Sequence, residues 1–148
     1  MSLRRVRTTS CVETEALAAE LALGLHAPLV VLLEGELGAG KTTFVRGFVG
    51  ALPGGESVTV QSPTFALART YPTSPPVHHL DLYRLAGRDS LEELGLLELL
   101  LDERAICLVE WPGALSMPVA WMRVRLAPVE DSSEERTIEV EFPNDDDA

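Results

Sequence analysis

Residues 29–52 place an apolar run, a glycine-rich segment and an amphipathic helical pattern in direct succession. The run at 29–33 is continuously apolar, which is typical of a strand buried on both faces. Beyond the glycines, apolar residues recur at helical spacing until Pro53 and two glycines end the pattern. This order predicts an α/β fold in which residues 29–33 form a central, parallel strand.

The glycine-rich segment fits the P-loop pattern G-x-x-x-x-G-K-[S/T]. Its residues are Gly35, Glu36, Leu37, Gly38, Ala39, Gly40, Lys41 and Thr42, and Thr43 follows. Because glycines let backbone N–H groups converge at a helix N-terminus, such a loop can cradle an anionic phosphate. In this pattern the lysine pairs with the β- and γ-phosphates and the hydroxyl binds Mg²⁺. We therefore predict that Lys41 contacts the phosphates and Thr42 the metal ion.

Lys41 is the only lysine in the chain, because all the other basic residues except histidine are arginine. Guanine-specific switch proteins recognise their base with an Asn/Thr-Lys-x-Asp element. The only lysine lies in the P-loop, and the only asparagine is Asn144, so the chain lacks that element. We therefore predict ATP, and not GTP, as the nucleotide.

A P-loop site also needs a carboxylate at the end of a neighbouring strand, to hold the metal ion directly or through water. Glu110 follows the apolar run at 105–109, and Asp81 follows the β-like segment that begins at residue 77. The sequence leaves open which of the two ligates the metal, and either could be a solvated strand end. Residues 62–65 could be a loop whose hydroxyl senses the γ-phosphate, or an ordinary turn.

The remaining pattern predicts a three-layer P-loop NTPase-type fold with a central mixed β-sheet. Ser10 and Glu13 form a capping-box pair at the start of a helical pattern. The predicted helices are 11–26, 41–52 and 90–103, and the predicted strands are 29–33, 57–60, 65–71, 77–81, 105–109, 122–126 and 137–142. The last two strands are expected to form an antiparallel hairpin with arginines opposite glutamates. Residues 1–143 are predicted to form one domain, and 144–148 a solvated acidic tail.

The net charge of the 148-residue chain is −11, and nine of its 23 acidic residues lie between 129 and 148. Phosphate backbones require a basic face, so this distribution argues against nucleic-acid binding by the chain alone.

The two cysteines are too few for a disulfide-stapled domain, which favours a reducing, cytoplasmic location. The apolar stretch at 14–33 contains Glu15, Glu20 and Pro28, and no secretory signal is readable, so we expect no membrane span.

Four segments together resemble the TsaE family, also called YjeE. They are the P-loop at 35–43, Ser-Pro-Thr-Phe at 62–65, His-Leu-Asp-Leu-Tyr-Arg-Leu at 79–85 and Glu-Trp-Pro at 110–112. The resemblance covers about residues 10–112. It implies a bacterial ATPase needed to form N6-threonylcarbamoyladenosine in tRNAs that read codons beginning with adenosine. It also implies ATP and Mg²⁺ as cofactors and TsaB and TsaD as partners, with tRNA contacted only through the complex.

The resemblance also assigns roles by position. Lys41 and Thr42 match the phosphate and Mg²⁺ residues, Glu110 matches the metal-site carboxylate, and Asp81 matches an acid important for hydrolysis. Arg136 matches an arginine that can approach the nucleotide. Trp111 and Thr64 match motif residues whose roles are less settled.

Two other functions stay open. A small-molecule kinase would need a second substrate pocket and an arginine-bearing lid, for which the chain has little length left. A nucleotide-controlled binding module would hydrolyse ATP too slowly for its turnover to matter.

Overall fold

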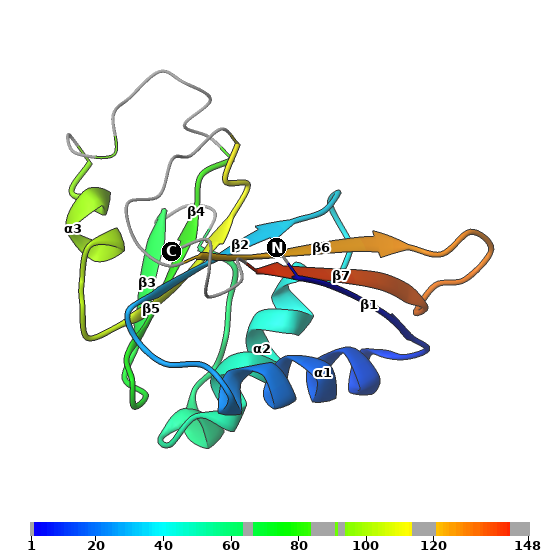
Figure 1. Ribbon diagram of the computed structural model, residues 1–148, viewed down its shortest axis with the longest axis horizontal. Helices are drawn as coiled ribbons and strands as arrows, with labels where there is room; N and C mark the ends of the chain where they lie inside the picture. Colours follow the sequence, from blue (N-terminus) through cyan, green and yellow to red (C-terminus); the bar gives the residue numbers. More distant parts are fainter. Residues whose placement is uncertain (1, 64–66, 84–90, 92–93, 114–120, 143–148) are drawn as a thin grey trace.

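The computed structural model describes residues 2–63, 67–83, 91, 94–113 and 121–142. These residues form one seven-stranded sheet with helices on both of its faces (Figure 1). The strands are β1 (Ser2–Thr8), β2 (Leu29–Glu34), β3 (Ala68–Tyr71), β4 (Val77–Asp81), β5 (Ile106–Glu110), β6 (Trp121–Pro128) and β7 (Arg136–Phe142). The helices are α1 (Cys11–Leu23), α2 (Lys41–Ala51) and α3 (Leu96–Leu100), with a 3-10 turn η1 (Gly55–Ser57). The sheet order is β1-β7-β6-β2-β5-β4-β3, so the predicted three-layer α/β class with a mixed sheet is confirmed.

The centre of the sheet is parallel, as the apolar run at 29–33 predicts. β2 lies between β5 and β6 and is parallel to both, and β4 is parallel to β5. Val31 and Leu33 pack in the core under α1 and α2, whereas Val30 and Leu32 pack in the smaller core that includes α3. A strand with apolar cores on both faces requires a continuous apolar sequence.

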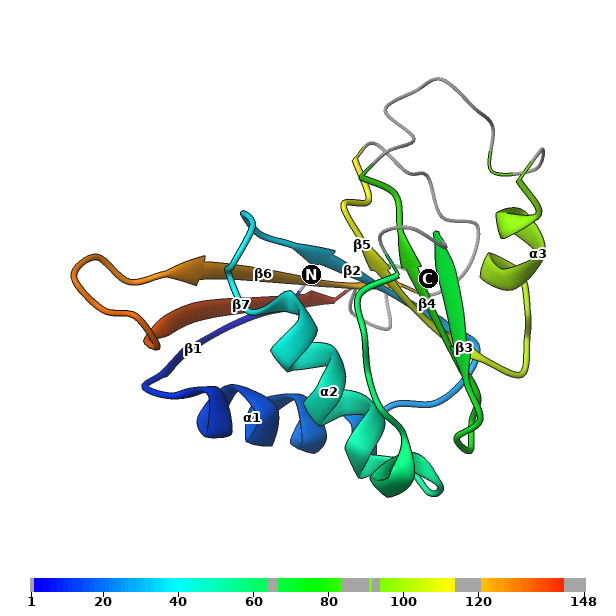
Figure 2. The same ribbon diagram turned by 180° about the vertical axis from the view of Figure 1, so that it is seen from behind.

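Helices α1 and α2 lie side by side on one face of the sheet, and α3 lies on the other (Figures 1 and 2). Helix α1 begins as predicted, because the Ser10 hydroxyl accepts a hydrogen bond from the Glu13 N–H at 3.2 Å. No helix among the described residues is both long and apolar enough to cross a bilayer.

Both ends of the sheet are antiparallel. At one end β3 and β4 form the hairpin predicted around the proline-rich loop 72–76. At the other end β6 and β7 form the predicted C-terminal hairpin, with Arg123 opposite Glu141 and Arg125 opposite Glu139. Arg125 also donates to the Glu34 carboxylate of β2 at 2.9 Å, so the charged face of the hairpin is tied to the central strand.

Strand β1 was not expected from the sequence. It adds to the outer edge of β7 in antiparallel pairing, with Ser2 opposite Phe142 and Thr8 opposite Arg136. Its sequence is rich in arginine and gives little apolar alternation. Charged side chains are common on edge strands, where they discourage pairing with other chains. The strand conformation of β1 therefore depends on its hydrogen-bonded pairing with β7, and not on a hydrophobic pattern in its own sequence.

The largest differences from the predicted elements concern 11–26, 57–60 and 90–103, while several other predicted strands differ from the structure by one to three residues at an end. Helix α1 ends at Leu23 and not at residue 26, because Gly24 closes it with an N–H directed at the Leu21 and Ala22 carbonyls. Residues 57–60 form no strand; the chain leaves η1 and runs past the sheet without pairing in it. Of the helix expected over 90–103, the described residues contain α3, which begins only after Gly95, because the Gly95 φ of +73° interrupts a right-handed helix; residues 90, 92 and 93 lie outside the described residues. The tail at 144–148 lies outside the described residues.

The α1–α2 contact generates a stability prediction. A Cβ atom on Gly47 would lie 2.3 Å from the Glu15 carbonyl oxygen, whereas one on Gly50 would have no atom within 4 Å. We expect Gly47→Ala to lower the free energy of unfolding by about 1–3 kcal/mol, because the helices must separate. Gly50→Ala is the matched control and should be neutral or stabilising by up to about 1 kcal/mol, because alanine favours a helix. Denaturant unfolding measures both, and equal effects would contradict the close helix contact.

Candidate functional site

Most of the predicted site residues line a pocket of about 280 Å³ at the ends of β2, β4 and β5. Five parts of the chain that are separate in sequence contribute to its wall. The lining residues are Leu37, Gly38, Gly40, Lys41, Thr42, Thr43, Ser62, Asp81, Glu110, Trp111 and Arg136. Gly35, Glu36 and Ala39 belong to the same loop but are not among the lining residues. Thr64 lies outside the described residues.

The loop between β2 and α2 depends on its glycines. Gly38 and Gly40 have φ angles of +80° and +103°, which side-chain-bearing residues rarely adopt. At Gly35 a Cβ atom would lie 2.7 Å from the Leu126 carbonyl oxygen of β6. The loop leads directly into α2, whose first N–H groups have no partner within the helix. This arrangement is the helix N-terminus to which phosphates commonly bind.

Lys41, the first residue of α2, points into the pocket from a buried position. Its Nζ donates to the Gly35 carbonyl at 2.6 Å and lies 3.6 Å from the centroid of the Trp111 ring. Burial lowers the pKa of Lys41, and the nearby carboxylates of Glu110, Asp81 and Glu36 oppose that shift. The lysine is therefore held among carboxylates, a loop carbonyl and an aromatic face.

Trp111 covers the lysine because of an uncommon backbone conformation. Its φ is +56°, in the left-handed region that few non-glycine residues occupy. The chain therefore turns sharply after β5, and the indole packs against Tyr83 with ring centroids 5.0 Å apart. Backbone strain of this kind is common at functional sites. Trp111 thus forms part of the pocket wall, although the sequence gives it no defined role.

Asp81 and Glu110 are directly opposite each other at the ends of the parallel strands β4 and β5. Both are buried, at 4% and 3% exposure. The Asp81 carboxylate accepts from the Tyr83 N–H at 2.9 Å, and Glu110 Oε2 lies 2.6 Å from His79 Nε2. The two candidates that the sequence left open are therefore neighbours in one pocket.

The oxygen atoms of this pocket suit Mg²⁺, which prefers carboxylates, hydroxyls and phosphates. Thr42, Asp81 and Glu110 all line the pocket and can supply such oxygens. In the part of the chain that the structure describes, no group of three or more His, Cys, Asp and Glu residues could hold a metal by itself. Mg²⁺ commonly uses one or two carboxylates together with substrate phosphates, so these residues fit a metal that arrives with a nucleotide.

Arg136 reaches the P-loop from β7. Its Nε donates to the Ala39 carbonyl at 2.9 Å, and its Nη2 donates to the Gly38 carbonyl at 3.1 Å. The third nitrogen, Nη1, donates to the carbonyls of Ser133 and Glu135 in the segment between β6 and β7. The guanidinium thus fastens the C-terminal hairpin to the loop, besides lining the pocket.

A buried polar pair, Tyr71 and His79, lies behind the pocket. His79 has no exposed surface, and its Nδ1 lies 3.1 Å from the Tyr71 hydroxyl, which donates to the Gln61 carbonyl at 3.1 Å. Burial raises the pKa of Tyr71 above its usual value, so the hydroxyl keeps its proton. The sequence distinguishes His79 only as part of the 79–85 motif. The period-two pattern of β4 places it on the same face as Asp81.

The strand–P-loop–helix unit and the paired carboxylates define a P-loop nucleotide-binding fold. The family model described as "Threonylcarbamoyl adenosine biosynthesis protein TsaE" matches residues 8–138, and the chain belongs to this family. Proteins of this family take part in tRNA threonylcarbamoyladenosine biosynthesis.

Individual relatives agree with this assignment. The tRNA threonylcarbamoyladenosine biosynthesis protein TsaE of Bacillus subtilis is 37% identical over 133 residues, which cover 89% of this chain and 81% of the relative. The protein of the same name from Streptomyces coelicolor is 46% identical over 99 residues, 64% of each chain. The crystal structure of Bacillus subtilis YdiB superposes with a TM-score of 0.76 at 28% identity, and the match covers 99% of this chain and 89% of YdiB.

The geometry of Lys41 generates a binding prediction. We expect Lys41→Ala to weaken ADP binding by about 10- to 100-fold, because charge-assisted hydrogen bonds contribute about 1.5–3 kcal/mol. Arg46→Ala on the same helix removes an exposed cation paired with Glu15 and should leave the affinity unchanged. Isothermal titration calorimetry measures both variants. Unchanged affinity in Lys41→Ala would contradict phosphate binding by this loop.

Proposed function

We propose that this chain is an ATPase that uses Mg²⁺ and acts with TsaB and TsaD to form the threonylcarbamoyl group on adenosine in tRNA. The observation that carries the proposal is the pairing of Asp81 and Glu110 beside Lys41 at the N-terminus of α2. Family membership supports the tRNA modification pathway. The absence of a guanine-recognition element from the sequence supports ATP as the nucleotide.

Each predicted site residue has a proposed part in hydrolysis. The loop residues 35–43 cradle the phosphates with backbone N–H groups, and Lys41 neutralises the β- and γ-phosphates. Thr42 and Glu110 would hold the metal ion, and Asp81 would orient the attacking water. Arg136 supports the loop and approaches the nucleotide. Bound Mg²⁺ would neutralise charge that develops on the phosphate oxygens.

A nucleotide-controlled binding module is the second candidate, favoured by exposed apolar groups near the pocket. Leu37 of the P-loop is 77% exposed, and Tyr83 is 53% exposed beside Trp111. Such groups suit contact with a partner protein. Phosphate release measured for the chain alone and with TsaB plus TsaD separates the two candidates. We expect turnover to rise with the partners, whereas a pure binding module would show none in either condition.

The two carboxylates generate a kinetic prediction. Glu110→Gln and Asp81→Asn should each lower kcat for ATP in the full complex by about 100-fold or more, because each replaces a negatively charged carboxylate beside the metal ion or the attacking water with a neutral amide. ADP binding should persist, since Lys41 and the loop are intact. Glu103→Gln, an exposed acid far from the pocket, is the control. A variant that turns over like the wild type would show that its carboxylate is structural.

The charge of the chain generates a prediction about tRNA. At a net charge of −11, the isolated protein should give no salt-sensitive gel shift with tRNA, because the binding of nucleic-acid backbones depends on basic contacts. Pull-downs of TsaB and TsaD by this protein should differ between ATP, ADP and no nucleotide, as in other P-loop switches. Salt-sensitive tRNA binding without partners, or partner binding indifferent to nucleotide, would contradict the proposed mechanism.

A further inference from the structure

Two consecutive histidines of β4, His78 and His79, lie on opposite faces of the sheet, and each ring contacts one hydroxyl and one carboxylate. The His79 ring lies between a hydroxyl at Nδ1 and a carboxylate at Nε2: Tyr71 at 3.1 Å and Glu110 at 2.6 Å. Neighbouring residues of a strand point to opposite faces. Of the two histidines, only His79 therefore lies on the face of the sheet that carries the P-loop and α2.

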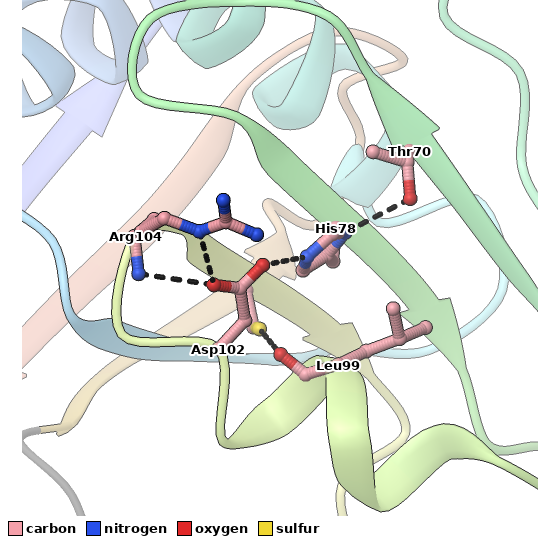
Figure 3. Close-up of polar contacts among 6 residues, drawn as sticks. Thr70, His78, Leu99, Asp102 and Arg104 are labelled. Carbon is pink, nitrogen blue, oxygen red and sulfur yellow. Dashed lines mark hydrogen bonds and ion pairs between the residues drawn. The ribbon is translucent and has the colours of Figure 1, made fainter.

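The His78 ring repeats this arrangement on the other face (Figure 3). The Thr70 hydroxyl lies 2.9 Å from its Nδ1, and the Asp102 carboxylate lies 2.9 Å from its Nε2. Asp102 also accepts from the Arg104 N–H at 3.0 Å. This second network joins β3 and β4 to the segment between α3 and β5, and none of its members lines the pocket. It offers an internal control for the first.

The His79 network connects two walls of the pocket through the interior. Glu110 lines the pocket, and its Oε2 is engaged by His79. At the other end, Tyr71 donates to the carbonyl of Gln61, whose neighbour Ser62 also lines the pocket. Glu110 and His79 are 3% and 0% exposed, so bulk water does not compete for these contacts. One carboxylate orientation is thereby favoured over the alternatives.

We propose that His79 is a positioning residue that fixes the Glu110 carboxylate for the Mg²⁺–nucleotide complex, and that Tyr71 couples this orientation to residues 61–63. The kinetic consequence rests on the proposed ATPase function, whereas the effect on Mg²⁺-dependent nucleotide binding does not. Groups that orient a metal ligand typically change metal affinity or activity by about 10- to 100-fold when removed.

Two substitutions of His79 separate its two contacts. A glutamine amide nitrogen can replace Nε2 and keep the hydrogen bond to Glu110, whereas an asparagine amide can replace Nδ1 and keep only the contact with Tyr71. His78→Asn is the matched control, because it should disturb the same strand without touching the pocket. Thermal unfolding of all three variants establishes how much stability each substitution removes.

The first readout is the ratio of ADP affinities with Mg²⁺ and with EDTA, measured by calorimetry. His79→Asn should reduce this ratio about tenfold or more, while His79→Gln and His78→Asn stay near the wild-type value. The second readout is ATP turnover with TsaB and TsaD, in which His79→Asn should lower kcat by a similar factor with little change in KM. His79→Gln should restore most of kcat.

Equal effects of His79→Asn and His78→Asn on the affinity ratio, or an unchanged ratio in His79→Asn, would overturn the positioning role. Wild-type protein without turnover would refute the ATPase proposal, while the affinity ratio would still decide the role of His79. If His79→Asn does not fold, Tyr71→Phe removes only the hydroxyl and Thr70→Val is its matched control. A lower affinity ratio in Tyr71→Phe alone supports the coupling, and equal ratios in the two variants overturn it.

Discussion

The parallel pairing of β2 with β5 and of β5 with β4 is the constraint on which the pocket depends. Parallel strands bring their carboxyl ends to the same edge of a sheet, so the groups that follow those strands must meet there. Backbone register places Asp81 opposite Glu110, and the P-loop follows β2 at the same edge. A slip of one residue in β4 would turn Asp81 and His79 toward the opposite face. The apolar cores on both faces of the sheet oppose such a slip.

Polar groups buried at this edge are stabilised by specific partners. An unpaired buried charge costs several kcal/mol, about as much as the net stability of a small domain allows. Lys41 donates a hydrogen bond to the Gly35 carbonyl and packs against Trp111, and Glu110 is hydrogen-bonded to His79. These contacts keep the pocket organised before any ligand arrives. Nucleotide binding would then exchange the Gly35 contact of Lys41 for phosphate oxygens.

The C-terminal hairpin has a second role besides closing the sheet. Arg136 is bonded to two P-loop carbonyls, and Gly35 packs so closely on Leu126 that a Cβ would not fit. The loop is therefore supported from β6 and β7 as well as by its own glycines. The family resemblance implied an arginine near the nucleotide, whereas the hydrogen bonds from Arg136 to the P-loop backbone are visible only in the folded chain.

The sequence by itself determined the features that are encoded locally. Residues 29–52 specify a buried strand, a glycine loop and a helix, because apolar periodicity, left-handed backbone and helix termination each depend on a few adjacent residues. The C-terminal hairpin follows from alternating charges in the same way.

By contrast, β1 has an arginine-rich sequence and becomes a strand only because β7 offers an edge. The segment at 57–60 has a β-like sequence but pairs with no strand of the described sheet. Tertiary structure decided three features of the site. It paired Asp81 with Glu110, brought Arg136 to the loop and buried His79 between Tyr71 and Glu110. Each depends on the register between strands that are distant in sequence, and the residue pattern of one strand does not specify that register.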